Sequence, residues 1–99
     1  MNSFEIDGRR IGPEFPPYLI AEIGINHGGD VTLAKRLIDE AIEAGADSIK
    51  LQAFNTDQFL SRSSPYFDVL NDASLTEEGL GELVRYAADK GVVLFSSVF

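Results

Sequence analysis

The stretch from Tyr18 to Phe54 limits the possible folds more than any other part of this sequence. Two short apolar segments rich in strand-forming residues, 18–23 and 48–54, flank a segment whose apolar residues recur every three or four positions. Asp30 stands at the position of a helix N-cap, and Gly45 stands where a left-handed residue ends a helix. The pattern predicts a βαβ crossover whose two strands run parallel.

The alternation of side chains along the second strand separates polar from apolar residues, because successive residues of a strand point to opposite faces. The apolar face consists of Ile49, Leu51 and Ala53, and the polar face consists of Ser48, Lys50 and Gln52. In the first strand, Glu22 shares a face with Gly24. Parallel strands are usually buried on both faces, so these polar side chains need partners or a polar ligand.

The residues before this unit predict a hairpin. Residues 4–6 and 9–11 read as two short strands joined by an Asp7-Gly8 tight turn. Prolines and glycines then interrupt regular structure. We therefore expect residues 1–17 to form an N-terminal hairpin and lead-in, placed to cap the bottom of a barrel.

The residues after the unit begin to repeat it. Thr76 is the expected cap of a second helix that ends at Gly91, and a third strand is expected from Val92 to Phe99. The apolar stripe expected on this helix consists of Leu80, Leu83, Val84, Ala87 and Ala88. The fold class expected is α/β, with residues 18–99 forming the first three strands and two helices of a (β/α)₈ TIM barrel whose remainder is absent.

Two connections follow the carboxyl ends of strands. The first, residues 24–30, carries three glycines and places Asn26 and His27 at the end of the first strand. The second, residues 55–75, is long for a strand-to-helix loop, which favours a functional role. Within it, Tyr66 and Phe67 either cover a site as a lid or pack down.

Composition narrows the function classes. The 99 residues are 44% hydrophobic, which suits one small domain with a core. A formal net charge of -8 argues against nucleic-acid binding. Neither a run long enough to span a membrane nor a signal region is evident, and cysteine is missing, so we expect a cytoplasmic protein without membrane contact.

Three motifs in order and spacing carry a family resemblance. They are IAEIGINHGGD at 20–30, AGADSIKLQAF at 44–54 and GVVLFSSVF at 91–99. Together they resemble the N-terminal barrel part of the sialic acid synthase family, whose members make N-acetylneuraminate, legionaminate or pseudaminate. The family pattern F-S-T-P-F aligns with 95–99, where Ser97 replaces Thr and Val98 replaces Pro. This departure leaves the role of the end of the third strand open.

The resemblance implies a transferase that condenses phosphoenolpyruvate with an N-acetylated amino sugar and releases phosphate. It implies a homodimer at full length, a C-terminal antifreeze-like domain, and a divalent metal, Mn²⁺ or Mg²⁺, whose ligands are expected beyond residue 99. By resemblance, Glu22 is the catalytic carboxylate, Lys50 binds phosphoenolpyruvate, and Gln52 lies at the substrate site. We also expect Asn26, His27 and Ser96 to contact substrate.

Each of these assignments has a structural alternative. Lys50 and Glu22 could form only an ion pair. Gln52 could satisfy neighbouring backbone, and Asn26 and His27 could pin their loop. Ser96, placed inward with Leu94 by alternation, could fill the core. For the whole protein, the alternatives are a related phosphoenolpyruvate aldol-type synthase of a 3-deoxy sugar acid and a non-catalytic barrel that binds a phosphorylated ligand. The 99 residues alone are expected to be inactive.

Overall fold

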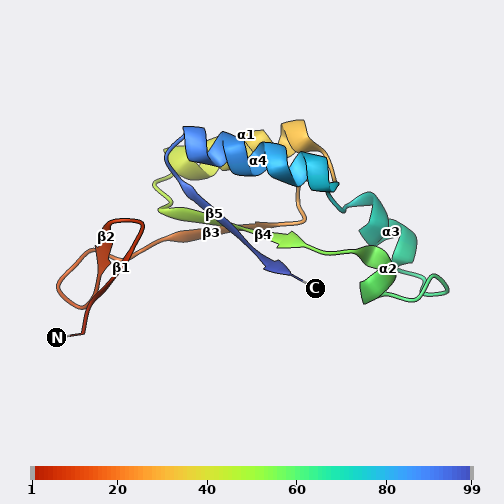
Figure 1. The fold of residues 1–99 in the computed structure, drawn as a ribbon, viewed down its shortest axis with the longest axis horizontal. Helices are drawn as coiled ribbons and strands as arrows, with labels where there is room; N and C mark the ends of the chain where they lie inside the picture. The colour runs from red at the N-terminus through yellow and green to blue at the C-terminus, as the bar shows by residue number, and fades with distance from the viewer. Residues whose placement is uncertain (1, 99) are drawn as a thin grey trace.

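Three parallel strands form the central sheet, and two helices cover one of its faces (Figure 1). The strands β3 (Ile20–Gly24), β4 (Ser48–Ala53) and β5 (Val93–Val98) lie side by side in that order. Helix α1 (Val31–Glu43) connects β3 to β4, and helix α4 (Glu77–Asp89) precedes β5. Both strand pairs are parallel, which confirms the predicted crossover.

This arrangement comes from a computed structural model, which describes residues 2–98 apart from the side chains of Asp57, Phe59 and Val98. The third strand was expected to reach Phe99, which lies outside the described residues. An α/β fold is confirmed, whereas closure into a barrel stays a prediction. No helix in the described part of the chain is long and apolar enough to cross a membrane.

The two long helices begin and end where the sequence predicts. The Asp30 carboxylate accepts a hydrogen bond from the Leu33 amide at 3.1 Å, and the Thr76 hydroxyl accepts one from the Gly79 amide at 3.0 Å. Each bond satisfies one amide of a first turn that lacks an intrahelical partner. Glycines with positive φ follow both helices, at 97° for Gly45 and 75° for Gly91.

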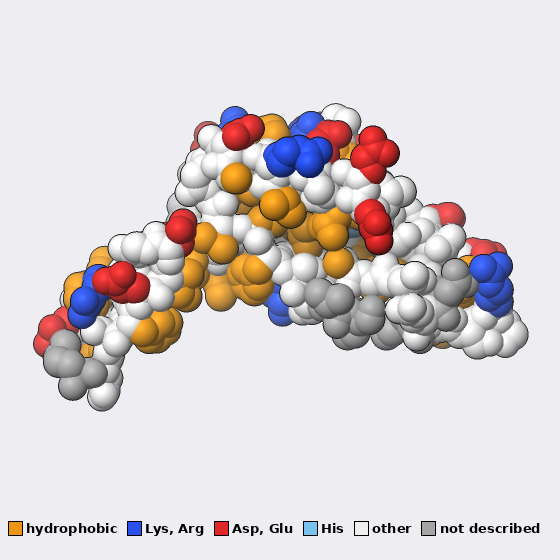
Figure 2. All heavy atoms as spheres, in the orientation of Figure 1, with side chains coloured by type: hydrophobic (Ala, Val, Ile, Leu, Met, Phe, Trp, Pro, Cys, Tyr) orange, Lys and Arg blue, Asp and Glu red, His pale blue; other side chains and the backbone are white. Residues whose placement is uncertain are grey.

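The core lies between the sheet and the helices. Ile49 and Leu51 of β4 are 0% and 1% exposed, and they cluster with residues of α1 and α4 that include Ile38 and Leu83. Figure 2 shows hydrophobic side chains between the helix layer and the sheet, with charged side chains on the outer surface of the helices. Burial of the apolar face predicted for β4 holds the two layers together.

The predicted apolar stripe of α4 is too wide. Leu83 and Ala87 are buried, but Val84 is 50% exposed and Ala88 is also exposed. Helix α4 packs against α1 and β5, and Val84 is absent from the described residues that pack against the core. The outer edge of the stripe therefore stays in solvent.

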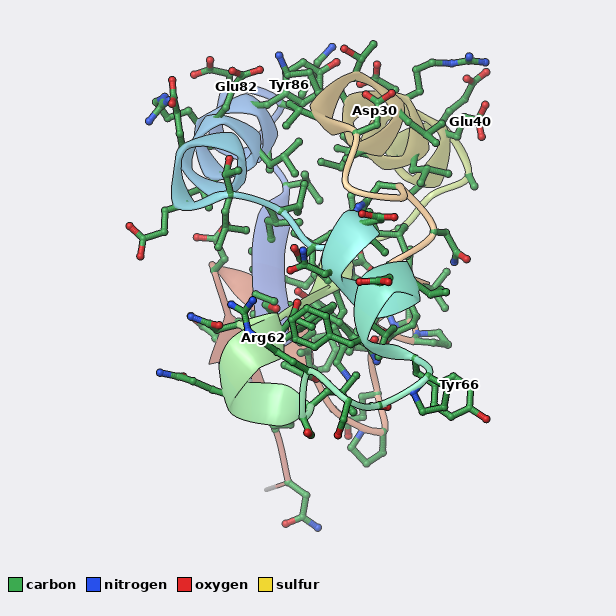
Figure 3. The ribbon with its side chains drawn as sticks, turned by 90° about the vertical axis from the view of Figure 1, so that its right-hand side faces the viewer. Asp30, Glu40, Arg62, Tyr66, Glu82 and Tyr86 are labelled. Atoms are coloured by element: carbon green, nitrogen blue, oxygen red, sulfur yellow. The ribbon has the colours of Figure 1, made fainter. Side chains whose placement is uncertain are left out.

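A polar contact joins the two helices across their outer seam. The Tyr86 hydroxyl donates to the Asp39 carboxylate, with oxygen distances of 2.7 and 2.8 Å. This hydrogen bond is the first cause of a raised Tyr86 pKa, because losing the phenol proton would place two negative charges together. Figure 3 shows Tyr86 at the top of the molecule, between the two helices.

The predicted hairpin is present at the end of the sheet where the parallel strands begin (Figure 1). Strands β1 (Phe4–Ile6) and β2 (Arg9–Ile11) pair antiparallel, and Asp7 and Gly8 have φ values of 49° and 82°, as a primed turn requires. Arg9 forms an ion pair with Asp47, which also accepts from the Leu19 amide at 2.8 Å. The hydrogen bond from the Leu19 amide is the main cause of a lowered Asp47 pKa, and the hydrogen bond and positive charge of Arg9 lower this pKa further.

The connection at 55–75 is more ordered than predicted. It contains two short helices, α2 (Thr56–Phe59) and α3 (Phe67–Asp72). Phe67 is buried, with the Arg62 guanidinium 5.5 Å from its ring centre. Tyr66 is 67% exposed and points away from the molecule (Figure 3). Of the two aromatic residues, Phe67 packs down, and neither closes over the strands.

Candidate functional site

The polar face of the sheet brings a cation and a carboxylate together. Ile49 and Leu51 point into the helix layer, so Lys50 between them points to the opposite face. Glu22 stands opposite Lys50 in the strand register, and the Lys50 Nζ lies 3.4 Å from Glu22 Oε2. The ion pair considered as the structural alternative for these two residues is therefore formed, and their roles toward substrate stay predictions.

This pair is more exposed than the sequence suggests. Burial on both faces was expected, but the Lys50 and Glu22 side chains are 34% and 51% exposed. The helices cover only one face of the sheet, and no described element covers the other. The ammonium is thus available to an anionic ligand approaching from the open face.

Strand β5 extends this polar face. The parallel register sets Phe95 opposite Lys50 and Ser97 opposite Gln52. Paired residues of neighbouring strands share a face, so the hydroxyl-bearing Ser97 stands beside Gln52 and one step along from Lys50. Ser97 was not among the predicted contacts, and the register between β4 and β5 is the signal that identifies it.

Ser96 lies on the other face. It stands opposite Leu51, a core residue, and its hydroxyl accepts from the Ala53 amide at 2.8 Å. The same hydroxyl can donate to the carbonyl of Leu51 at 3.2 Å or of Ser97 at 2.7 Å. The structure does not bring Ser96 together with Lys50, and its polar capacity is used to join the ends of β4 and β5.

A bulge in β3 changes the alternation expected next to Glu22. Glu22 pairs with Lys50 while Gly24 pairs with Leu51, so three residues of β3 oppose two of β4. Gly24 therefore stands opposite a residue of the helix-facing side rather than on the face of Glu22. Its φ of 53° favours glycine and turns the chain into the loop that follows.

The loop that follows β3 exposes Asn26 but buries its neighbour His27. Asn26 is exposed at the carboxyl end of β3, whereas His27 is 1% exposed. The Nδ1 atom of His27 accepts from the Gly29 amide at 2.9 Å, which places the imidazole proton on Nε2. Nε2 is buried without a hydrogen-bond partner among the described residues. This geometry fits the structural alternative, in which His27 pins its loop, and contact of His27 with substrate stays a prediction.

Burial also sets the charge of His27. Desolvation lowers its pKa because the interior disfavours the imidazolium, and the Gly24 backbone acts in the opposite direction to a smaller extent. The side chain is therefore neutral near pH 7. A neutral, enclosed imidazole can hold the loop but cannot present a positive charge to a substrate.

A cavity of about 580 Å³ lies at the carboxyl end of β4, beside the first turn of α4. Its polar lining residues include Asn55, Thr56, Gln58, Asn71, Ser74 and Glu77. The Thr56 hydroxyl is buried and has no hydrogen-bond partner in the described part of the chain. Lys and Arg are missing from the described lining residues, so the cavity suits an uncharged ligand with hydroxyl or amide groups better than an anion.

The described residues do not form a metal site. Among the side chains that the structure describes, which do not include that of Asp57, no group of three or more His, Asp or Glu residues lies close enough together to hold an ion. His27 is enclosed and separate from Glu22, and we assign neither as a ligand. We therefore derive no chemical step from a metal held by this chain.

Comparison with known proteins gives one family match. A family model described as the NeuB family matches residues 37–99. This region begins within α1 and includes Lys50, Gln52, the cavity and β5.

Individual relatives match most of the chain. An uncharacterized protein of Methanocaldococcus jannaschii is 38% identical over 97 residues, which are 98% of this chain and 29% of that protein. The N,N'-diacetyllegionaminic acid synthase of Legionella pneumophila is 32% identical over 102 residues, covering 89% of this chain and 29% of the relative. The chain thus spans less than a third of the length of these relatives.

A solved structure agrees with the fold. The crystal structure of an N-acetylneuraminic acid (sialic acid) synthetase from Leptospira borgpetersenii, in complex with citrate, superposes with a TM-score of 0.88 and 32% sequence identity. The match covers 99% of this chain and 34% of that chain.

Proposed function

Because this chain belongs to the NeuB family, we propose that it supplies the phosphoenolpyruvate site of an enzyme that makes nonulosonic, sialic-type acids. The observation that carries the proposal is the Lys50 and Glu22 pair on the open face of the sheet. The relatives named as N,N'-diacetyllegionaminic acid synthase and N-acetylneuraminic acid synthetase support the product class.

Lys50 is the proposed anchor for phosphoenolpyruvate. This substrate carries a phosphate and a carboxylate, and an ammonium next to either group provides a charge-assisted hydrogen bond. Gln52 and Ser97, which follow along the same face, offer hydrogen bonds that orient the bound enol. The acidic surface of the chain does not oppose this binding, because the local field at contact distance outweighs the net charge.

Glu22 is the proposed acid-base group. In the condensation, C3 of phosphoenolpyruvate attacks the aldehyde carbon of the open-chain sugar, forming the new C–C bond while the aldehyde oxygen takes up a proton. Water then adds at C2, losing a proton, and the C–O bond to phosphate breaks. A carboxylate on the same face as Lys50 can orient the water and accept its proton.

The cavity beside β4 is the proposed site of the acceptor sugar. An N-acetylated amino sugar is uncharged and carries hydroxyl and amide groups, which match the side chains of Asn71, Ser74 and Thr56. The cavity and Lys50 both belong to β4 or the residues after it, so the two substrates would approach from the carboxyl end of one strand.

Several features of the complete enzyme remain proposals. They are closure of the sheet into a (β/α)₈ barrel, a homodimer, and a Mn²⁺ or Mg²⁺ ion held by residues from outside this chain. A related synthase of a 3-deoxy sugar acid would share the phosphoenolpyruvate site but take a different acceptor.

The test is phosphate release by the full natural chain that carries these residues, with phosphoenolpyruvate, Mn²⁺ and either N-acetylmannosamine or its 6-deoxy diamino analogues. We expect release that requires both the enol phosphate and an N-acetylated sugar. Release only with aldoses that lack the N-acetyl group would favour the 3-deoxy sugar acid synthase. Binding of phosphoenolpyruvate without release would favour a non-catalytic barrel.

A further inference from the structure

Gly29 lies against the backbone that joins α3 to α4. A Cβ built on Gly29 would lie 2.5 Å from the Asp72 carbonyl oxygen and 3.0 Å from the Ser74 carbonyl oxygen. Side chains do not approach backbone oxygens this closely, so any residue other than glycine at 29 displaces this backbone by roughly 1 Å. The loop after β3 and the segment before α4 therefore meet without a side chain between them.

A second contact holds the other end of the same segment. Val31, the first residue of α1, lies beneath Gly79 in the first turn of α4, where an added Cβ would be 2.9 Å from Val31 Cγ2. Figure 3 shows the chain that leads to α1, near Asp30, passing beside α3. Residues 29–31 thus contact the segment 72–79 at both ends.

The supported segment is one wall of the cavity. Asn71, Ser74, Thr76 and Glu77 all line it. The Ser74 hydroxyl also donates to the Asn71 carbonyl at 2.7 Å, so the two residues move together. Displacement of the Asp72 or Ser74 carbonyl would therefore move the polar groups that face the cavity.

The supporting loop is itself held firmly. The Gly29 amide donates to Nδ1 of His27, which is almost fully buried. The Asp30 side chain caps α1 immediately afterwards. Local bonds thus hold Gly29 itself and the Asp30 that follows it, which leaves the α3–α4 segment as the part that yields under strain.

We propose that residues 29–31 are a positioning element that fixes the cavity wall at 71–77. The consequence for the sugar rests on the proposed function: Gly29 determines the position of the cavity wall that contacts the acceptor sugar, without contacting the sugar itself. The two glycines of this loop differ in what surrounds them. Gly28, with φ of 62°, has open space where a Cβ would be, whereas Gly29, with φ of 81°, has the opposing backbone.

This difference provides a matched control. Gly28→Ala and Gly29→Ala both place alanine at a positive φ, so both carry the same kind of backbone strain, but only Gly29→Ala pushes on the cavity wall. Hydrogen exchange in the full natural chain should show the amides of 71–77 exchanging about tenfold faster in Gly29→Ala than in Gly28→Ala. Exchange at the same rate in the two variants would overturn the proposal.

Kinetics test the consequence for the sugar. We expect Gly29→Ala to raise the KM for the acceptor sugar about 10- to 100-fold relative to Gly28→Ala, with the KM for phosphoenolpyruvate unchanged. Equal rises in both KM values would indicate general disruption and contradict a positioning role. If the unmodified chain releases no phosphate, the proposed function fails, while hydrogen exchange still decides the role of Gly29.

A second pair of variants applies if Gly29→Ala does not fold. Gly79→Ala pushes on Val31 Cγ2 at 2.9 Å and on the Thr76 hydroxyl at 3.1 Å, whereas Gly81→Ala meets only the end of the Arg85 side chain at 3.5 Å. Because Thr76 caps α4, the amides of 71–74 are the ones that report on the contact with Val31. Faster exchange at 71–74 in Gly79→Ala than in Gly81→Ala would support the proposal. The same exchange in both would count against it.

Discussion

Lys50 and Glu22 stand directly opposite each other on adjacent parallel strands, with Nζ 3.4 Å from Oε2, on the face of the sheet that the helices leave open. A partly exposed ion pair of this kind contributes only about 0.2 to 1 kcal/mol to stability. Stability alone is therefore a weak reason for placing two charges within a sheet. Binding of a ligand that contacts both groups explains their position better.

Replacing Glu22 separates its catalytic role from its pairing role. Glu22→Gln keeps the size of the side chain but removes the proton acceptor, so we expect kcat for phosphate release to fall about 10²- to 10⁴-fold with a similar KM for phosphoenolpyruvate. Glu82→Gln is the control, because Glu82 also pairs with a lysine, at 2.6 Å, but on the helix surface. Equal, mild effects of Glu22→Gln and Lys50→Met would indicate a purely structural ion pair.

Neighbouring serines of β5 should respond differently to alanine. Ser96→Ala leaves the Ala53 amide without its acceptor and should destabilise the fold by about 1 kcal/mol, with the KM for phosphoenolpyruvate unchanged. Ser97→Ala should raise that KM and leave stability nearly unchanged. Chemical denaturation and steady-state kinetics measure the two effects. A reversed pattern would show that the strand register does not identify the ligand face.

Acid should weaken the fold through His27. The folded-state pKa lies below the ordinary 6.5, so the unfolded chain binds a proton first as the pH falls. The stability contributed by neutral His27 is therefore complete above pH 6.5 and is lost below it, by at most about 1.4 kcal/mol per pH unit. His27→Gln should show a flatter fall in unfolding free energy between pH 7.5 and 5.5. Parallel curves for the two proteins would contradict the burial of a neutral imidazole.

The sequence predicts those parts of the fold whose signals are local. Asp30, Thr76 and the glycines after the helices mark element boundaries through backbone chemistry that depends on few neighbours. Alternation along β4 likewise separates Lys50 from Leu51, because one face of the strand is apolar throughout.

Features that depend on contacts between distant segments could not be predicted from the sequence. The bulge beside Glu22 and the position of Ser97 beside Gln52 both follow from strand register, which alternation within one strand does not fix. Helices α2 and α3 are too short for a periodic signal. The different surroundings of Gly28 and Gly29 arise only when the β3–α1 loop meets the α3–α4 segment.

The central claim is that the Lys50 ammonium binds phosphoenolpyruvate, and calorimetric titration of that ligand into the full natural chain tests it most directly. Lys35 is a matched control: it is 32% exposed against 34% for Lys50, and it also pairs with a glutamate, but on the outer helix surface. We predict that Lys50→Met raises the Kd about 10- to 100-fold, as loss of one charge-assisted hydrogen bond implies, while Lys35→Met leaves it unchanged. Equal Kd values for the two variants and the unmodified chain would contradict the claim.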